Sequence, residues 1–307
     1  MMRVLKFGGS SLVNADAVRH VAGLVREQAE LDELVLVCSA CGGVTNHLVQ
    51  VVELVRTGRT VQALIEVNAI SARHRALLFA LDLGAAEPRA WLELEELRCE
   101  LRELVARATI SKADAAWSDA IVSYGERASV RLVAAALRQT GVKAEAVDAT
   151  EFLVTNDSFQ SALPLWDETR PRAAEVLGPL IARGATPVVT GFIGATRDGK
   201  ITTLDRNSSD YSAAIIGELV DADEVCIWTD VDGVYDRDPR GVGELPELLE
   251  ELSYAEALYL AERGAKVLHP RTIQPLQEKE IALRIRNTFR PEHTGTHIGP
   301  EATSLVR

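Results

Sequence analysis

Short, strongly apolar runs alternate along the chain with longer stretches of helical periodicity, and this alternation restricts the fold more than any other feature. The runs are continuous rather than alternating with polar residues, which is typical of strands buried on both faces. Such strands are predicted over residues 3–7, 34–38, 143–147, 186–190, 224–228 and 282–285. Strands separated by helices predict an α/β fold, with a mainly parallel sheet covered on both sides.

Helices are predicted between these strands. In the first, over residues 15–28, the side chains of Val18, Val21, Ala22 and Val25 share one face, and Asn14 precedes it as an N-cap. The others are predicted over residues 44–57, 119–140, 169–183, 209–220, 254–263 and 270–279. Residues 60–108 contain only helix-forming segments, and their glutamates alternate with leucines, so a helical insertion with one solvated face is predicted.

Charge and length exclude several classes of function. The 307 residues suffice for one large domain or two closely joined lobes. The net charge is −12 and the sequence has no basic stripe, so nucleic acid is not an expected partner. No apolar run is long enough to cross a bilayer, and the N-terminal segment lacks the layout of a signal peptide. A cytoplasmic protein without a membrane partner is predicted.

Two of the four cysteines, Cys38 and Cys41, have the spacing of a redox motif. A redox role would require a thioredoxin-like context, and a zinc site would require a second pair or histidines at ligand spacing. The sequence has neither, so we predict a structural role and no metal-ligating set.

A lysine at a strand end, followed by two glycines and two hydroxyls, is the first segment suited to chemistry (residues 4–11, VLKFGGSS). Glycines let the backbone approach a phosphate, and Lys6 adds a mobile positive charge. The lysine precedes the glycines, so this is not a Walker A loop, and the G-x-G-x-x-G fingerprint is missing. By itself the segment fits a tight strand–helix turn equally well.

A second glycine-rich turn follows the next strand (residues 38–46, CSACGGVTN). Because the carboxyl ends of parallel strands meet at one edge, we expect both turns at the same ligand-binding rim. Ser39 and Thr45 could hold a carboxylate or phosphate there, although Thr45 could instead cap its helix.

The third segment is residues 202–210 (TTLDRNSSD). Arg206 could clamp a substrate carboxylate through two parallel hydrogen bonds. Asp210 could orient a lysine or a metal-bound water. Alternatively, Ser209 or Asp210 could be a simple N-cap.

Two later segments are suited to a nucleotide. In residues 228–240 (WTDVDGVYDRDPR), Thr229, Asp230 and Tyr235 could hold a base and ribose, and Arg240 could reach phosphates. The aspartates there do not fit an EF-hand. In residues 264–270 (GAKVLHP), Lys266 stands in a small and apolar stretch. His269 beside it is predicted to be a structural hydrogen-bonding residue.

In this order and at these spacings, the five segments resemble the aspartokinase family of the amino-acid kinase superfamily, over residues 4–299. The match is particularly to the kinase part of bifunctional aspartokinase–homoserine dehydrogenases. The resemblance implies a three-layer α-β-α sandwich with a central, mainly parallel sheet, the carbamate kinase-like fold. It implies a catalytic domain over residues 1–299, with an amino-acid lobe (about 1–200), a nucleotide lobe (about 201–299) and a tail (300–307). No ACT domain is expected.

The resemblance also implies an activity. An aspartate kinase would use ATP and Mg²⁺ to phosphorylate the side-chain carboxylate of L-aspartate, the first step of aspartate-family amino-acid biosynthesis. The product would be β-aspartyl phosphate. The family further suggests a homodimer.

Site roles follow from the resemblance, position by position. Lys6, with Gly8 and Gly9, would contact the transferring phosphoryl group, and Asp210 would organise the catalytic lysines. Glu126 would bind the amino group of aspartate and Arg206 its α-carboxylate. The whole aspartate pocket would comprise Ser39, Thr45, Glu126, Phe192, Arg206 and Ser209. The nucleotide would be surrounded by Ser10, Thr229, Asp230, Tyr235, Arg240 and Lys266.

The third segment departs from the family pattern, because Asp205 and Ser208 stand where the family usually has glycine. If either position needs a positive φ angle, the substitution costs about 1 kcal/mol or reshapes the loop. Asp205 also adds negative charge beside a site for two anions. We therefore predict altered affinity or substrate choice. Two alternatives stay open: a kinase for another amino acid or carboxylate, and a non-catalytic homologue that binds nucleotide or amino acid.

Overall fold

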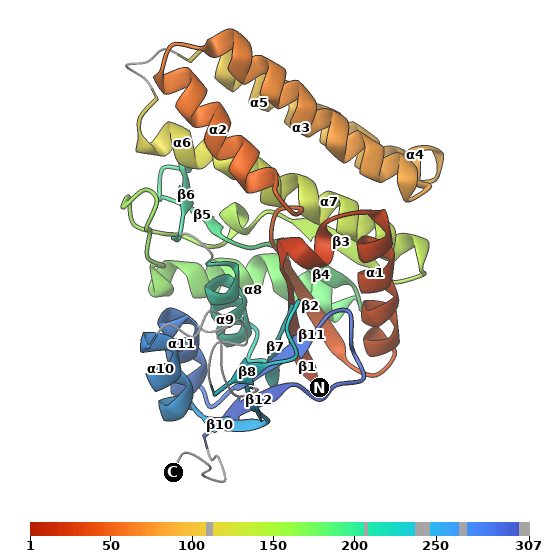
Figure 1. The fold of residues 1–307 in the computed structure, drawn as a ribbon, viewed down its shortest axis with the longest axis vertical. Coiled ribbons are helices and arrows are strands. Elements are labelled where there is room, and N and C mark those ends of the chain that lie inside the picture. The colour runs from red at the N-terminus through yellow and green to blue at the C-terminus, as the bar shows by residue number, and fades with distance from the viewer. Residues whose placement is uncertain (109–112, 206–207, 237–245, 264–268, 301–307) are drawn as a thin grey trace.

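The computed structural model describes residues 1–108, 113–205, 208–236, 246–263 and 269–300 (Figure 1). Its centre is an eight-stranded sheet. In spatial order the strands are β10 (Glu251–Ser253), β12 (Thr296–Gly299), β11 (Ala282–Asn287), β7 (Glu224–Thr229), β1 (Met2–Phe7), β2 (Glu33–Cys38), β4 (Thr186–Thr190) and β3 (Ala144–Val147). Neighbouring strands are parallel except β11 and β12, which are antiparallel. All six predicted strands are present.

Strands that the sequence did not predict are short. They are β10, β12 and two small hairpins, one of β5 (Ile193–Ala195) with β6 (Ile201–Thr203) and one of β8 (Val234–Tyr235) with β9 (Leu248–Leu249). Runs of two to four residues are too short to show a period, so the strands with which they pair decide their conformation.

Helices cover both faces of the sheet. One core contains Leu5 and Phe7 of β1, and it is covered by α1 (Ala15–Ala29), α2 (Val44–Arg56) and α7 (Tyr124–Gln139). The other contains Val4 of β1 and is covered by α8 (Trp166–Ala182), α9 (Ser209–Leu219), α10 (Tyr254–Glu262) and α11 (Pro270–Glu278). Successive strand residues point to opposite cores, so continuous apolar runs fill both. The predicted three-layer α/β fold is confirmed.

The first helix agrees closely with its prediction. The side chain of Asn14 accepts a hydrogen bond from the backbone N–H of Ala17 at 2.9 Å, so it caps α1. The predicted apolar face is buried. By contrast, the single helix predicted over residues 119–140 is wrong. Two helices, α6 (Ala115–Val122) and α7, meet at Ser123. The backbone of Ser123 keeps helical φ and ψ angles, so the interruption is slight, and serine is not a residue that marks a helix break in the sequence.

The predicted helical insertion is confirmed. It consists of α3 (Thr60–Ala80), α4 (Leu83–Ala86) and α5 (Pro88–Ala106), and α3 and α5 lie side by side along the top of the molecule (Figure 1). On α5, Leu94, Leu97 and Leu101 are buried, whereas Glu96 and Glu103 are exposed. Among the described residues, no helix is long and apolar enough to cross a membrane.

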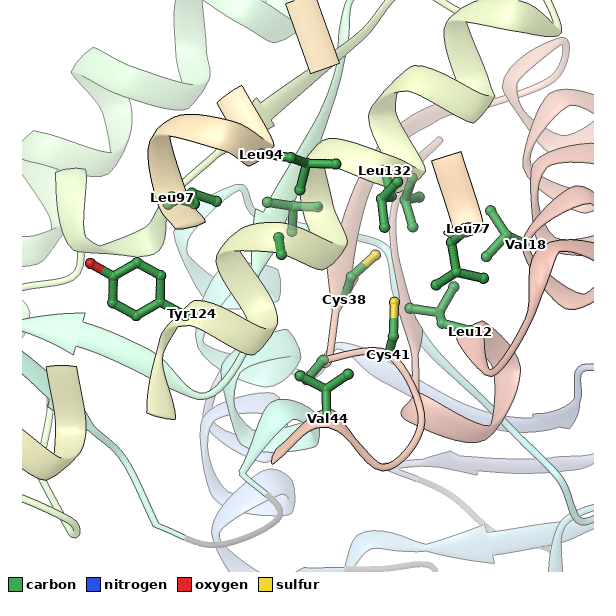
Figure 2. Close-up of a cluster of buried hydrophobic side chains, with 14 of the residues drawn as sticks. Leu12, Val18, Cys38, Cys41, Val44, Leu77, Leu94, Leu97, Tyr124 and Leu132 are labelled. Carbon is green, nitrogen blue, oxygen red and sulfur yellow. The ribbon is translucent and has the colours of Figure 1, made fainter. Parts of the chain in front are cut away.

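Cys38 and Cys41 are free thiols inside the first core, close to Leu12 and Val44 (Figure 2). Burial raises the pKa of both thiols, that of Cys41 to about 11. Thiols that stay protonated are poor nucleophiles, which agrees with a structural role.

Candidate active site

The sheet register aligns the carboxyl ends of four strands. Phe7, the last residue of β1, is level with Cys38 of β2 and Trp228 of β7, and Cys38 is level with Thr190 of β4. The segments that follow these strands therefore begin at one edge, where open α/β sheets bind ligands. Three of them are segments selected from the sequence, and the fourth begins with Gly191.

Lys6 meets Asp210 at this edge. The side chain of Lys6 is nearly buried, and its Nζ lies 2.6 Å from Oδ1 of Asp210, in the first turn of α9. The contact has the distance of an ion pair but not the angles of a hydrogen bond. The structure thus places the carboxylate of Asp210 against the ammonium group of Lys6.

The two glycine-rich turns pack backbone against backbone. A Cβ atom on Gly9 would lie 3.0 Å from the carbonyl oxygen of Ala40, and one on Gly42 would lie 2.8 Å from the carbonyl oxygen of Gly9. Arg73 of α3 donates hydrogen bonds to the carbonyl oxygens of Gly42 and Val13 and so supports the second turn. Side chains at either glycine would push the turns apart, so the sequence needs glycine here.

Side chains around the two turns differ in exposure. Ser10 is exposed at the first turn, whereas its neighbour Ser11 is buried and hydrogen-bonds Thr288 through the two hydroxyls at 2.7 Å. In the second turn Gly43, with a φ angle of 83°, occupies the N-cap position of α2. Thr45 is therefore not the cap, and the capping alternative for it is wrong.

Glu126 lies behind the second turn. Its side chain is 3% exposed, and its Oε1 accepts a hydrogen bond from the backbone N–H of Ala40 at 3.1 Å. Its Oε2 is buried with no hydrogen-bond partner among the described residues. Burial raises the pKa of this carboxyl to about 8. The approach of α7 depends on Gly125, where a Cβ atom would lie 2.7 Å from the Cβ of Ala40.

Phe192 follows β4 with a φ angle of 69°, in the left-handed region that side chains disfavour. Its N–H donates to Oγ of Ser212 at 2.7 Å, and its carbonyl oxygen accepts from the N–H of Leu204 at 2.9 Å. Next to it, Gly191 lets β4 approach Ser209, because a Cβ atom there would lie 2.9 Å from the Cβ and Oγ of Ser209. The positive φ angle of Phe192 costs about 1–3 kcal/mol, and it persists only where the surrounding structure imposes it.

The third segment does not need the glycines expected there. Ser208 has a φ angle of −82°, and Asp205 is not among the described residues with positive φ, so the condition for backbone strain is met at neither position. Ser208 occupies the N-cap position of α9 without a side-chain capping bond, so neither Ser209 nor Asp210 is a cap. The Oδ2 of Asp205 lies 3.9 Å from Nη1 of Arg271. Arg206 lies outside the described residues.

The nucleotide segment begins at the end of β7. Thr229 accepts a hydrogen bond from the N–H of Thr288 through its carbonyl oxygen at 2.8 Å, and its hydroxyl donates to Oδ1 of Asp230 at 3.3 Å. Since Thr288 also bonds Ser11, it links this segment to the first glycine turn. Asp230 is exposed and Tyr235 is half-buried in β8. Arg240 and Lys266 lie outside the described residues.

Asp232 is a residue that our sequence reasoning did not assign to the site. Its Oδ1 accepts from Nδ2 of Asn287 at 2.7 Å, and its Oδ2 pairs with Nη1 of Arg290 at 2.6 Å. Burial and the nearby Asp232 carboxylate raise the pKa of the Tyr235 hydroxyl. The signal available in the sequence was the second of two alternating aspartates.

His269 caps α11, since its Nδ1 accepts a hydrogen bond from the N–H of Arg271 at 3.3 Å, which agrees with the predicted structural role. Within the described ranges, no group of three or more His, Cys, Asp or Glu side chains is placed to hold a metal ion.

The chain is similar to several known proteins. The sequence model of the amino acid kinase family matches residues 1–287. Lysine-sensitive aspartokinase 3 of Escherichia coli is 36% identical over 293 residues, which cover 95% of this chain and 63% of that protein. Bifunctional aspartokinase/homoserine dehydrogenase 2 of E. coli is 37% identical over 295 residues, or 95% of this chain and 35% of that protein.

A solved structure is also similar. The crystal structure of E. coli aspartokinase III in complex with aspartate and ADP superimposes with a TM-score of 0.83 and 33% identity, covering 99% of this chain and 66% of that one. The chain thus spans less than two thirds of the length of these relatives. From the family match over nearly its whole length, the chain belongs to the amino acid kinase family.

Proposed function

We propose that the chain is an aspartate kinase, which transfers the γ-phosphoryl group of ATP to the side-chain carboxylate of L-aspartate. The products are 4-phospho-L-aspartate and ADP. Similarity to aspartokinases over most of the chain supports this assignment, as does the similarity to a structure that holds aspartate and ADP.

The observation that carries the proposal is the state of Glu126. A buried carboxylate with one oxygen lacking any partner among the described residues is costly unless a cation joins it. The ammonium group of an amino-acid substrate would supply both the positive charge and the hydrogen bond. A substrate without an amino group would leave Oε2 unsatisfied, so Glu126 favours an amino acid.

The remaining residues suit phosphoryl transfer to a carboxylate. An oxygen of the substrate carboxylate attacks the γ-phosphorus in line, and the bond to the β,γ-bridging oxygen breaks. Repulsion between the anions is the main obstacle, and positive charge together with backbone N–H groups offsets it. Lys6 supplies this charge beside the turn that contains Gly8 and Gly9, and Asp210 holds the lysine in place.

Mg²⁺ would supply further neutralisation of the phosphate charge. Mg²⁺ is commonly bound through substrate phosphates and water with one or two carboxylates, so it needs no dedicated cage of protein ligands. Asp210 offers one carboxylate for this mode beside Lys6.

Several broader expectations belong to the same proposal. Residues 1–299 would form one catalytic domain, with the lobe boundary near residue 200. The Lys6–Asp210 contact would then join the two lobes. A cytoplasmic location and a homodimer are further expectations from the family resemblance, and size-exclusion chromatography with light scattering would test the latter.

A hydroxamate-trapping assay with ATP, Mg²⁺ and a panel of amino acids tests the proposal, because hydroxylamine captures an acyl phosphate. We expect a signal with L-aspartate. A signal only with another acid would instead identify a kinase of different specificity, consistent with the unusual Asp205. No signal with any acid, despite measurable ATP binding, would support a non-catalytic homologue.

A further inference from the structure

A buried carboxylate outside the assigned site, that of Asp119, connects two sides of the proposed aspartate pocket. Asp119 lies on α6, is 2% exposed, and has no ion-pair partner within the described part of the chain. Burial raises its pKa, and hydrogen bonds to it act in the opposite direction. Burying a carboxylate costs free energy of folding unless hydrogen bonds compensate for the lost water. The residues that donate those bonds therefore indicate the role of the carboxylate.

Three donors surround this carboxylate. Its Oδ2 accepts from the backbone N–H groups of Gln160 at 2.8 Å and Thr203 at 2.9 Å, and its Oδ1 accepts from the hydroxyl of Thr203 at 3.0 Å. Gln160 has a φ angle of 71°, so its loop is held in a conformation that side chains disfavour. Thr203 is the last residue of β6 and the second residue of the third segment.

The backbone around Thr203 is bonded to that around Phe192. The two strands of the β5–β6 hairpin pair Ile193 with Thr203, and the N–H of Leu204 donates to the carbonyl oxygen of Phe192 at 2.9 Å. Any shift of β6 therefore moves the backbone that holds Phe192 in its strained conformation.

Asp119 is also connected, through the helix junction, to the turn that carries Glu126. Its carbonyl oxygen accepts from the N–H of Ser123 at 3.0 Å, at the junction where α6 passes into α7. Glu126 lies in the first turn of α7. Asp119 thus contacts the helix junction beside Glu126 through its backbone and the hairpin beside Phe192 through its side chain.

We propose that Asp119 is a positioning residue, which sets the distance between the ammonium-binding side of the aspartate pocket at Glu126 and the opposite side at Phe192. This inference rests on the proposed aspartate kinase activity. It predicts that loss of the Asp119 hydrogen bonds weakens use of L-aspartate while leaving the nucleotide segment, which they do not touch, intact.

Three variants separate positioning from simple stability. Asp119→Ala removes all three hydrogen bonds, and Thr203→Val removes only the hydroxyl bond. In Asp119→Asn, the amide oxygen can accept from both N–H groups while the NH₂ group donates to the Thr203 hydroxyl, so it should rescue function. The matched control is Thr169→Val on α8, which removes a buried hydroxyl that is hydrogen-bonded to the backbone of Val154.

The KM values for L-aspartate and ATP are measured for each variant at a temperature well below its unfolding midpoint. We expect Asp119→Ala to raise the KM for L-aspartate by about tenfold or more and Thr203→Val by roughly fivefold, with the KM for ATP within about twofold. Asp119→Asn and Thr169→Val should keep the wild-type KM for L-aspartate. If Asp119→Ala fails to fold, Thr203→Val decides the question.

Two results would overturn the inference. The first is a KM for L-aspartate in Asp119→Ala and Thr203→Val no higher than in Thr169→Val. The second is an equal rise in both KM values. In either case an active wild-type enzyme leaves the proposed function intact, whereas a wild type that does not phosphorylate aspartate refutes both.

Discussion

The Nζ atom of Lys6 lies 2.6 Å from Oδ1 of Asp210. A lysine next to the end of β1 thus forms a nearly buried ion pair with an aspartate in the first turn of α9. Because the ion pair fixes its side chain, Lys6 presents its positive charge at one place on the sheet edge. The chemistry proposed here depends on that charge and on the turn of Gly8 and Gly9 beside it.

Replacing Lys6 by alanine should reduce kcat by about 100- to 1,000-fold, because one preorganised charge at the transferring group is lost. The fold should persist, since a strand-end lysine contributes little to core packing. Steady-state kinetics and circular dichroism measure the two effects. The double variant Lys6→Ala with Asp210→Asn controls for the carboxylate left without its partner. Turnover near the wild-type rate would refute the assigned role.

Glu126 should make aspartate binding pH-dependent. Burial raises its pKa to about 8 in the free protein, so at pH 7 the carboxyl is mostly protonated, and binding of an ammonium group favours its ionised form. Affinity for L-aspartate should therefore rise as the pH rises through about 8. Calorimetry at pH 7 in buffers of different ionisation enthalpy should detect proton release on binding.

Glu126→Gln is the control for that measurement, because the amide oxygen can still accept from Ala40 while the charge is absent. We expect the KM for L-aspartate to rise by about tenfold or more and the proton release to disappear. Unchanged proton release in this variant would assign the titration to another group.

Gly125→Ala should separate α7 from the second glycine turn, because the new Cβ would lie 2.7 Å from the Cβ of Ala40. Overpacking of this kind costs about 1–3 kcal/mol of unfolding free energy, and it should also raise the KM for L-aspartate by moving Glu126. Gly23→Ala, in α1 with no atom within 4 Å of the new Cβ, is the matched control. It should stabilise the protein by about 0.5–1 kcal/mol in urea unfolding.

Restoring the glycine that the family usually has at position 208 should not stabilise the protein. Ser208 has an ordinary φ angle of −82°, and its hydroxyl donates to the carbonyl oxygen of Asp205. Ser208→Gly should therefore lower the free energy of unfolding by about 0.5–1 kcal/mol, through added backbone freedom. A rise in the thermal midpoint would show instead that serine strains this turn.

His74 should make the insertion acid-sensitive. Its side chain is 5% exposed, its Nδ1 bonds the carbonyl oxygen of Ile70, and burial lowers its pKa from 6.5 to about 4. The unfolded chain therefore binds a proton at higher pH than the folded one. Stability that is complete above about pH 6.5 should fall as the pH is lowered through 4, by roughly 2 kcal/mol at pH 5.

The comparison of urea unfolding at pH 7 and pH 5 between the wild type and His74→Leu isolates this effect. The variant should lose that part of the pH dependence and keep the rest. An equal pH dependence in both proteins would mean that His74 is not the responsible group.

Many features of the fold could be predicted from local sequence. The continuous apolar runs identified the six central strands, and Asn14 with its apolar face identified α1. The β5–β6 hairpin could not be predicted in this way, because strands of three residues are too short to show a period. The division between α6 and α7 was also missed. The backbone of Ser123 stays helical, so the interruption is slight and has no breaker residue at Ser123 to reveal it.

The sequence by itself determined which residues follow the carboxyl ends of parallel strands, because strand order along a chain and residue type are local properties. Lys6, Ser39 and Thr229 were selected as candidate site residues in that way. Only the tertiary structure decided that Asp210 pairs with Lys6, that Glu126 has an oxygen without a hydrogen-bond partner among the described residues, and that Asp119 bonds the backbone of Thr203. The reason is physical: burial, ion pairing and hydrogen-bond satisfaction depend on neighbours that distant segments supply.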